Sequence, residues 1–285
     1  MLTKALEVRL LKVGSCRHLE CLAVRGGRVT PIVFPSLAAL IMHPDAGPIL
    51  FDTGYAEHFH EATQAFPERL YRWATPVSLP AGQRLERQLA RHGVRTSDIK
   101  ICVVSHFHAD HIAGLRDLPS ARIITLKRGY ETFREPGQWR RLLGGSLPGL
   151  APTDLSARLT LADSCTPVPL PQPWDLLGQG HDLLGDGSLI GVPLPGHSPG
   201  HMGLLLRDHE QRSVLFAADS SWSSHAIADN LMPSRLVRPI FENWEAYRHT
   251  LELIHRTVSV HRELVVLPSH CEAGLSRYDA TWGAQ

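Results

Sequence analysis

The sequence predicts an α/β fold in one domain, built of two packed sheets flanked by helices. Short apolar stretches typical of buried strands alternate along the chain with segments of helical periodicity. No linker divides residues 1–285 into parts of different composition, and 43% hydrophobic side chains are enough for one large core. We therefore expect a single domain that covers residues 1–285.

Composition excludes several functional classes. The 29 basic and 28 acidic residues nearly cancel, so there is no overall field to attract nucleic acid or an anionic membrane, and a small molecule is the expected partner. Charges run through residues 1–10, where a signal peptide would be apolar, and no apolar run reaches the roughly 18–20 residues of a membrane span. We expect a cytoplasmic protein. Its five scattered cysteines favour neither a disulfide framework nor a zinc ribbon.

The first half of the chain reads as strands that are interrupted by one irregular segment. Residues 55–80 carry aromatic side chains among prolines, and so long a loop in a compact domain is usually a lid or an interface. A satellite core beneath a loop is the other interpretation. Periodicity predicts strands at 6–13, 35–43, 49–51 and 101–104, and a helix at 81–92.

The second half is less regular, because residues 135–185 are rich in Pro, Gly and Leu. We interpret this stretch as an insertion with short strands. The remaining pattern predicts helices at 112–118, 128–134 and 244–257, and strands at 121–126, 188–194, 202–206, 213–218 and 264–267.

Possible metal ligands follow the predicted strands. An Asp or a His stands at the end of five apolar runs, as Asp52, His106, His197, Asp219 and His270. The carboxyl ends of strands are where ligands commonly bind in α/β folds, so these side chains are expected along one edge. For Asp52 the alternative is a simple turn aspartate.

Residues 105–114 carry the densest cluster, with three histidines and one aspartate within six positions. His106 and His108 can point the same way from an extended or looped backbone, and Asp110 and His111 can turn toward a neighbouring point. Imidazole and carboxylate groups are suitable ligands for zinc, and also for iron or manganese. A lone histidine is weak evidence, but this spacing predicts a metal site.

The chain resembles the metallo-β-lactamase superfamily in this His-x-His-x-Asp-His motif and in the order of the other parts. These parts are Asp52-Thr53-Gly54, the loop from Pro195 to His201, Asp219 after a strand, and His270 after the last strand. The resemblance implies a four-layer αβ/βα sandwich with a metal site at the sheet edges.

The resemblance also implies a role for each ligand. One metal would be held by His106, His108 and His197, the other by Asp110, His111 and His270, and Asp219 would bridge them. Two zinc ions are expected, with iron, manganese or cobalt as alternatives.

The resemblance gives Asp110 a second role and implies that two further positions, Asp52 and His201, lie beside the ligands. Asp110 would also orient the nucleophile and move a proton to the leaving group. Asp52 would fix the tautomer of a ligand histidine. His201 would either support a ligand in the same way or serve as a structural histidine.

Within the superfamily, the chain is most similar to the N-acyl homoserine lactonase branch, with its relatives among methyl parathion hydrolases and pyridoxolactonases. Those lactonases usually carry a tyrosine three residues after the bridging aspartate, and here that residue is Trp222. An indole can shape a pocket or donate one hydrogen bond, but it cannot act as that phenol. Relatives in this branch are often dimers, so a homodimer is one alternative, and the sequence leaves the oligomeric state open.

The resemblance implies a dinuclear zinc hydrolase that opens a lactone or cleaves a related carboxylic ester. The runner-up is an oxidoreductase with one iron, similar to persulfide dioxygenases. Other hydrolases of the fold, with phosphotriesterase, thioesterase or β-lactamase activity, are a further alternative. The last alternative is a binding protein of the same fold that has no catalytic activity.

Overall fold

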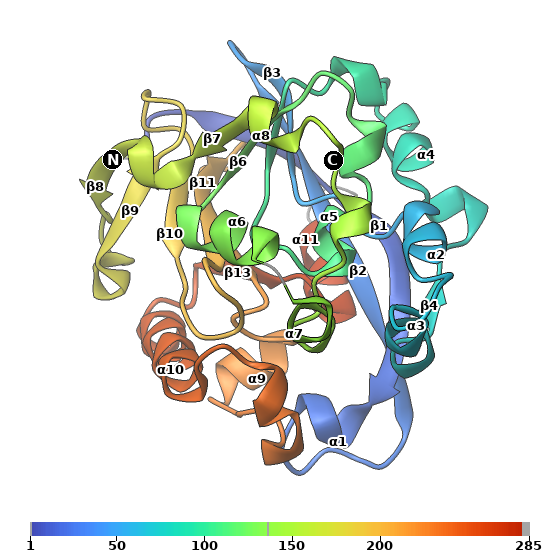
Figure 1. Cartoon of the computed structure of the whole chain (residues 1–285). Helices are drawn as coiled ribbons and strands as arrows, with labels where there is room; N and C mark the ends of the chain where they lie inside the picture. The colour runs from blue at the N-terminus through green and yellow to red at the C-terminus, as the bar shows by residue number, and fades with distance from the viewer. Residues whose placement is uncertain (1, 136, 281–285) are drawn as a thin grey trace.

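The computed structural model describes residues 2–135 and 137–280, in which two sheets lie between layers of helices (Figure 1). The first sheet contains, in spatial order, β7 (Leu159–Leu161), β6 (Arg122–Thr125), β5 (Ile101–Val103), β3 (Gly47–Phe51), β2 (Pro31–His43) and β1 (Ala5–Leu19), and β4 (Val77–Ser78) pairs with β1. The second contains β8 (Thr166–Pro169), β9 (Gln179–Asp182), β10 (Ile190–Pro193), β11 (Met202–Asp208), β12 (Ser213–Ala218) and β13 (Val265–Pro268).

Helices cover the outer faces of both sheets and the sheet edges. The α-helices are α1 (Glu20–Ala23), α2 (His58–Ala62), α3 (Arg69–Ala74), α4 (Leu85–Ala90), α5 (Ala109–Ile112), α6 (Lys127–Arg134), α7 (Gln138–Leu143), α8 (Leu155–Arg158), α9 (Ser224–Ala228), α10 (Trp244–Val260) and α11 (Glu272–Ala280). The 3₁₀ helices are η1 (Ala81–Gln83), η2 (Thr96–Asp98), η3 (Leu115–Asp117), η4 (Pro148–Leu150), η5 (Ala162–Ser164), η6 (Asp175–Leu177) and η7 (Arg235–Ile240).

The two sheets pack face to face around a central core. Successive side chains of β3 point to opposite faces of the first sheet. Phe51 points toward the second sheet and contacts Phe216 of β12, with 5.6 Å between the ring centroids. Leu50 points the other way and belongs to the core beneath the outer helices. A short parallel pairing of β1 with β11 joins the sheets at Ala5 and Leu6.

The outer layers complete the sandwich. Leu85 and Leu89 of α4 pack on the first sheet, and Leu251 and Ile254 of α10 pack on the second. The order of layers is therefore helices, sheet, sheet, helices, which confirms the predicted α/β sandwich.

Several predicted boundaries differ from the structure. The predicted helix 81–92 is divided into η1 and α4, and the helix predicted at 112–118 is replaced by α5, which begins within the histidine cluster, and by η3. Residues 55–80 fold as α2, α3 and β4. The segment 135–185 contains the short strands that were predicted for it: β7 pairs with β6 and β9 pairs with β10, so that this segment extends both sheets.

No helix within residues 2–135 and 137–280 combines the length and the apolar composition that are needed to cross a membrane. The described part of the chain does not include residues 1, 136 and 281–285. Both ends of the predicted domain 1–285 therefore lie outside it.

Candidate metal centre

The predicted ligand residues come together at one edge of the sandwich. β3 and β5 are parallel, as are β12 and β13, so the carboxyl ends of each pair lie side by side. Asp52 follows β3, and Asp219 follows β12. Five of these side chains are almost completely buried: Asp52, His106, His111, His197 and Asp219.

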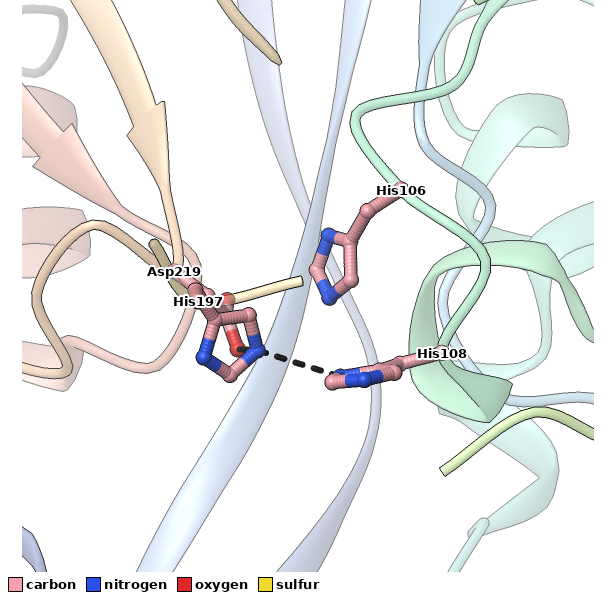
Figure 2. Close-up of side chains that lie close together, drawn as sticks. All are labelled: His106, His108, His197 and Asp219. Atoms are coloured by element: carbon pink, nitrogen blue, oxygen red, sulfur yellow. Dashed lines mark hydrogen bonds and ion pairs between the residues drawn. The ribbon is translucent and has the colours of Figure 1, made fainter. Parts of the chain in front are cut away.

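The first group of possible ligands consists of His106, His108, His197 and Asp219. Their ligand atoms all lie within 4.8 Å of one another. Figure 2 shows the three imidazoles and the carboxylate turned toward one point, with His106 and His108 entering from the loop before α5. His197 Nε2 lies 3.1 Å from His108 Nδ1 and 3.2 Å from Asp219 Oδ2. This is a compact donor set of three nitrogens and one oxygen.

Asp110, His111 and His270 form the second group. His270 Nε2 lies 3.3 Å from Asp110 Oδ2, and His111 Nε2 lies 3.7 Å from the same oxygen. Asp219 stands between the groups: Oδ1 is 3.3 Å from His111 Nε2, and Oδ2 is 3.2 Å from His270 Nε2. Asp219 thus touches histidines of both groups, which is the geometry that a bridging ligand requires.

Buried polar atoms without partners show that the pocket between these side chains fits a cation. Among the described residues, His106 Nε2, His111 Nε2 and Asp219 Oδ1 are buried and make no hydrogen bond. Leaving such atoms unpaired costs about 1–3 kcal/mol each. Imidazole nitrogen and carboxylate oxygen suit zinc and also iron, manganese or cobalt. The residues present therefore fit a metal, and the individual ligand roles stay predictions.

Opposite charges shape the site. Burial would raise the pKa of Asp219, but His270, His111 and His197 hold it well below its usual range. Burial lowers the pKa of His270, and the Asp219 carboxylate outweighs this effect and raises it to about 9. In the first group, burial and the neighbouring His197 lower the pKa of His108 to about 3. A neutral imidazole is the form that binds metal, and a bound cation would displace the proton from His270.

The ring nitrogens that face away from the pocket are held in place. His111 Nδ1 donates to Asp52 Oδ2 at 2.7 Å, and His270 Nδ1 donates to the carbonyl oxygen of Pro35 at 2.8 Å. Ser105 Oγ donates to Asp52 at 2.8 Å and lies 3.0 Å from His106 Nδ1. Such contacts fix the tautomer and the orientation of a ligand imidazole.

His201 contacts the backbone of Asp219 and makes no hydrogen bond to a ligand imidazole. Its Nδ1 donates to the carbonyl oxygen of Leu194 at 2.8 Å, so its Nε2 accepts from the Asp219 amide at 3.0 Å. Burial and the nearby His197 lower the pKa of His201 to about 3, which keeps the ring neutral. His201 thereby fixes the backbone of the residue between the two groups.

Trp222 also contacts Asp219. Its indole Nε1 donates to Asp219 Oδ2 at 3.3 Å, and its ring meets the His197 ring edge-on at 6.1 Å. The tryptophan lines a cavity of about 430 Å³ that opens above Asp110, Asp219 and His270.

Sequence reasoning missed His18 as a side chain of this cavity, whereas Tyr71 lies in the segment 55–80 that was predicted as a lid or an interface. Alternation along β1 places His18 on the same face as Cys16. No sequence signal marks that face as the wall of a cavity, because the other walls come from segments such as α3 and α7 that are distant in sequence.

A third cluster of possible ligands, His43, Asp45 and Asp186, lies elsewhere. The Lys4 ammonium is 2.5 Å from Asp45 and 2.6 Å from Asp186, so a cationic side chain already pairs with both carboxylates.

Comparison with known proteins identifies the family. Residues 32–256 match the model described as the Metallo-beta-lactamase superfamily. The chain belongs to this superfamily. The predicted family is thereby confirmed.

The relatives include a probable metallo-hydrolase and N-acyl homoserine lactonases. A probable metallo-hydrolase of Mycobacterium bovis is 26% identical over 64% of this chain and 55% of its own length. The N-acyl homoserine lactonase AttM of Agrobacterium fabrum is 26% identical over 70% of each chain. The chain spans about half the length of the mycobacterial relative.

Solved structures share the fold. An N-acyl homoserine lactone hydrolase with the product N-hexanoyl-L-homoserine at its catalytic metal centre aligns over 95% of both chains, with a TM-score of 0.69 and 18% identity. The dizinc quorum-quenching lactonase AidC aligns over 95% of this chain and 90% of its own, with a TM-score of 0.65 and 15% identity.

Proposed function

We propose that the protein is a dinuclear zinc hydrolase that opens a lactone or cleaves a related carboxylic ester of small-molecule size. The observation that carries the proposal is the position of Asp219 between two groups of ligand atoms, within 3.3 Å of histidines of both. The lactonase descriptions of relatives such as AttM support the substrate class.

Bound zinc supplies a nucleophilic water at neutral pH and polarises the substrate carbonyl. The protein's own residues would position the reactants around it. The cavity is lined by candidate ligands of both groups, namely His108, Asp110, His197 and His270. An ester group bound in the cavity would therefore lie beside both groups. The largely apolar walls exclude water from the reacting atoms.

Asp110 is the residue that we assign to proton transfer. Its Oδ2 faces His270 Nε2 at 3.3 Å, and its carboxylate lines the cavity. From this position Asp110 can accept the proton of the attacking water and pass it to the leaving alkoxide oxygen. No protein nucleophile is required.

Metal analysis together with a panel of lactones and esters tests this proposal. We expect about two metal ions per chain, and His108→Ala should lose metal and activity together, while the exposed His249→Ala keeps both. Full activity in metal-free protein would contradict the proposal. A single iron with oxygen consumption on glutathione persulfide would identify a dioxygenase instead. Intact metal without turnover on any lactone, ester, thioester, phosphotriester or β-lactam would identify a binding protein.

A further inference from the structure

Four short helices, α1, α3, α7 and η7, contribute to the wall of the cavity above the metal centre. The Phe66 ring, just before α3, meets the Trp139 ring of α7 edge-on at 5.7 Å. The Ser234 amide, just before η7, donates to the Leu22 carbonyl oxygen of α1 at 3.1 Å. The helices α1, α3 and α7 all lie in the lower half of Figure 1. We call these helices and their flanking residues the rim, which comprises residues 20–29, 66–75, 138–145 and 234–240.

The rim exposes large apolar side chains. Ten such side chains are exposed in the part of the chain that the structure describes, and seven of them belong to the rim. Trp73 is 68% exposed, Leu143 71% and Leu236 80%. Apolar side chains that gather on one part of a surface typically mark a site of interaction with a protein or a membrane.

A ligand inside the cavity would not cover all of these side chains. Trp139 and Leu143 line the cavity, so a bound ligand can reach them. Trp73 and Leu236 are not part of the cavity lining, although they stand on the helices that form its wall. The apolar surface of the rim therefore extends beyond the cavity, and its partner must be larger than a ligand that fills the cavity.

Positive charge is concentrated in the rim. Its sequence contains eight arginines and only two glutamates, whereas the whole chain has a net charge of +1. Both glutamates are engaged: Glu20 pairs with Arg28 at 2.9 Å, and Glu68 Oε1 accepts from Gln138 at 2.8 Å. The nearly balanced charge of the chain thus conceals an uneven distribution, with a strongly basic rim.

Four arginines of the rim have guanidinium groups that are not used within the protein. Arg25, Arg72, Arg235 and Arg238 make no ion pair and no side-chain hydrogen bond with any described residue. Arg72 is half-buried, and the other three are exposed. A guanidinium group presents several donors in one plane and binds phosphate oxygens in pairs, so these side chains are suited to a phosphate-bearing partner.

An anionic lipid surface matches both properties of the rim. Tryptophan and leucine side chains can enter the boundary between headgroups and acyl chains, while arginines bind the lipid phosphates. A second copy of the chain matches less well. In a twofold symmetric dimer the same patch lies on both sides of the interface, so the unpaired arginines would face one another and repel.

We propose that the rim docks on an anionic lipid bilayer, with the mouth of the cavity facing the lipid. The apolar side chains of the rim enter the bilayer surface, and its unpaired arginines bind the headgroup phosphates. This inference goes beyond the proposed hydrolysis and does not depend on it, because docking is measured without turnover.

Sedimentation with sucrose-loaded vesicles tests the docking. One set of vesicles contains phosphatidylcholine alone, and the other contains equal parts of phosphatidylcholine and phosphatidylglycerol. We expect the partition coefficient to be about 100-fold higher on the anionic vesicles, because each arginine near such a surface contributes about fivefold. High salt should remove most of this preference, since it screens the charges.

Two double variants separate the charged from the apolar contribution. Arg235→Gln with Arg238→Gln should lower the partition coefficient on anionic vesicles about 20-fold, and should not change the weak binding to phosphatidylcholine. Trp73→Ser with Leu236→Ser should lower it about tenfold or more, because two exposed apolar side chains can no longer enter the bilayer.

The end of α10 supplies matched controls outside the rim. Val260 is 76% exposed and Arg262 is exposed, and neither lines the cavity. Val260→Ser with Arg262→Gln should leave binding to both kinds of vesicle unchanged. Thermal unfolding of every variant must match the wild type, and the arginine variant carries the test if the apolar one does not fold.

The possible outcomes either support or overturn the docking. Equal binding of the wild type to both kinds of vesicle overturns it, and so do equal losses in the rim and control variants. A dimer in sedimentation velocity that dissociates in the Trp73→Ser, Leu236→Ser variant would show that a second copy covers the rim, which also overturns the docking. None of these results bears on the proposed hydrolysis, which metal analysis and the substrate panel decide.

Discussion

Asp52 Oδ2 lies 2.7 Å from His111 Nδ1, and both side chains are completely buried. The same carboxylate accepts from the Ser105 amide and hydroxyl, each at 2.8 Å. Asp52 adopts a φ of 58°, in the left-handed region where Asp and Asn are the best-tolerated residues after glycine. The backbone therefore turns this carboxylate inward, away from solvent and onto a candidate ligand.

Asp52→Asn should weaken metal binding without unfolding the protein. Asn tolerates the same backbone conformation, but a neutral amide orients and polarises the His111 ring less well than a carboxylate does. We expect affinity for zinc to fall about 10–100-fold, as is typical when such a partner of a ligand histidine is removed. Competition with a chromophoric chelator measures the affinity. Unchanged affinity would mean that Asp52 is only a turn residue.

Much of the site could be predicted because its ligands are marked locally. Asp52, Asp219 and His270 each follow a short apolar strand, and parallel neighbours bring such strand ends to one edge. The fold class followed from the same alternation of strands and helices. Both predictions use information within a few residues of each position.

The parts that could not be predicted depend on contacts between distant segments. His18 lines a cavity only because α3 and α7, which are distant in sequence, form the neighbouring walls. α5 is four residues long and begins at Ala109, so it is too short for periodicity to detect. β7 and β9 lie in a Pro- and Gly-rich segment, and only their pairing with β6 and β10 reveals them as strands.

Gly196→Ala should displace the loop that carries His197. Gly196 has a φ of +126°, and a Cβ there would lie 2.1 Å from the Tyr247 amide nitrogen of α10. Because α10 is a long packed helix, the loop must move instead. We expect the protein to lose about 3 kcal/mol or more of unfolding free energy, together with metal occupancy.

Urea unfolding and metal analysis check this loss, and Gly185→Ala is the matched control. Gly185 also has a positive φ, of +79°, but a Cβ there meets nothing within 4 Å. This variant should cost only about 1–2 kcal/mol from backbone strain. Equal effects of the two substitutions would contradict a role for the close contact between Gly196 and Tyr247.

Substitutions of Trp222 should separate its hydrogen bond from its bulk. Trp222→Phe removes the 3.3 Å bond to Asp219 Oδ2 and keeps an aromatic ring against Phe241. We expect kcat to fall by a few fold, about 1 kcal/mol, because the carboxylate loses one donor. Trp222→Ala also removes a cavity wall and should raise KM. Steady-state kinetics on the same lactone decide this. A wild-type kcat in Trp222→Phe would show that the hydrogen bond contributes nothing, and identical parameters for the two variants would show that the bulk of the ring contributes nothing.

Cys16 should resist alkylation although it lines the cavity. Burial, reinforced by the charge of Asp110, raises the pKa of the Cys16 thiol to about 12. The thiolate is the reactive form, so at pH 8 almost all of the Cys16 thiol is in the unreactive protonated form. Native protein treated with iodoacetamide should therefore be modified at the half-buried Cys21 well before Cys16, as peptide mass mapping would show. Urea should abolish the difference, since unfolding exposes both thiols to water. Modification of Cys16 in native protein as fast as Cys21 would mean that the cavity wall around β1 opens in solution, and protection of Cys16 by a bound lactone would then locate the substrate beside it.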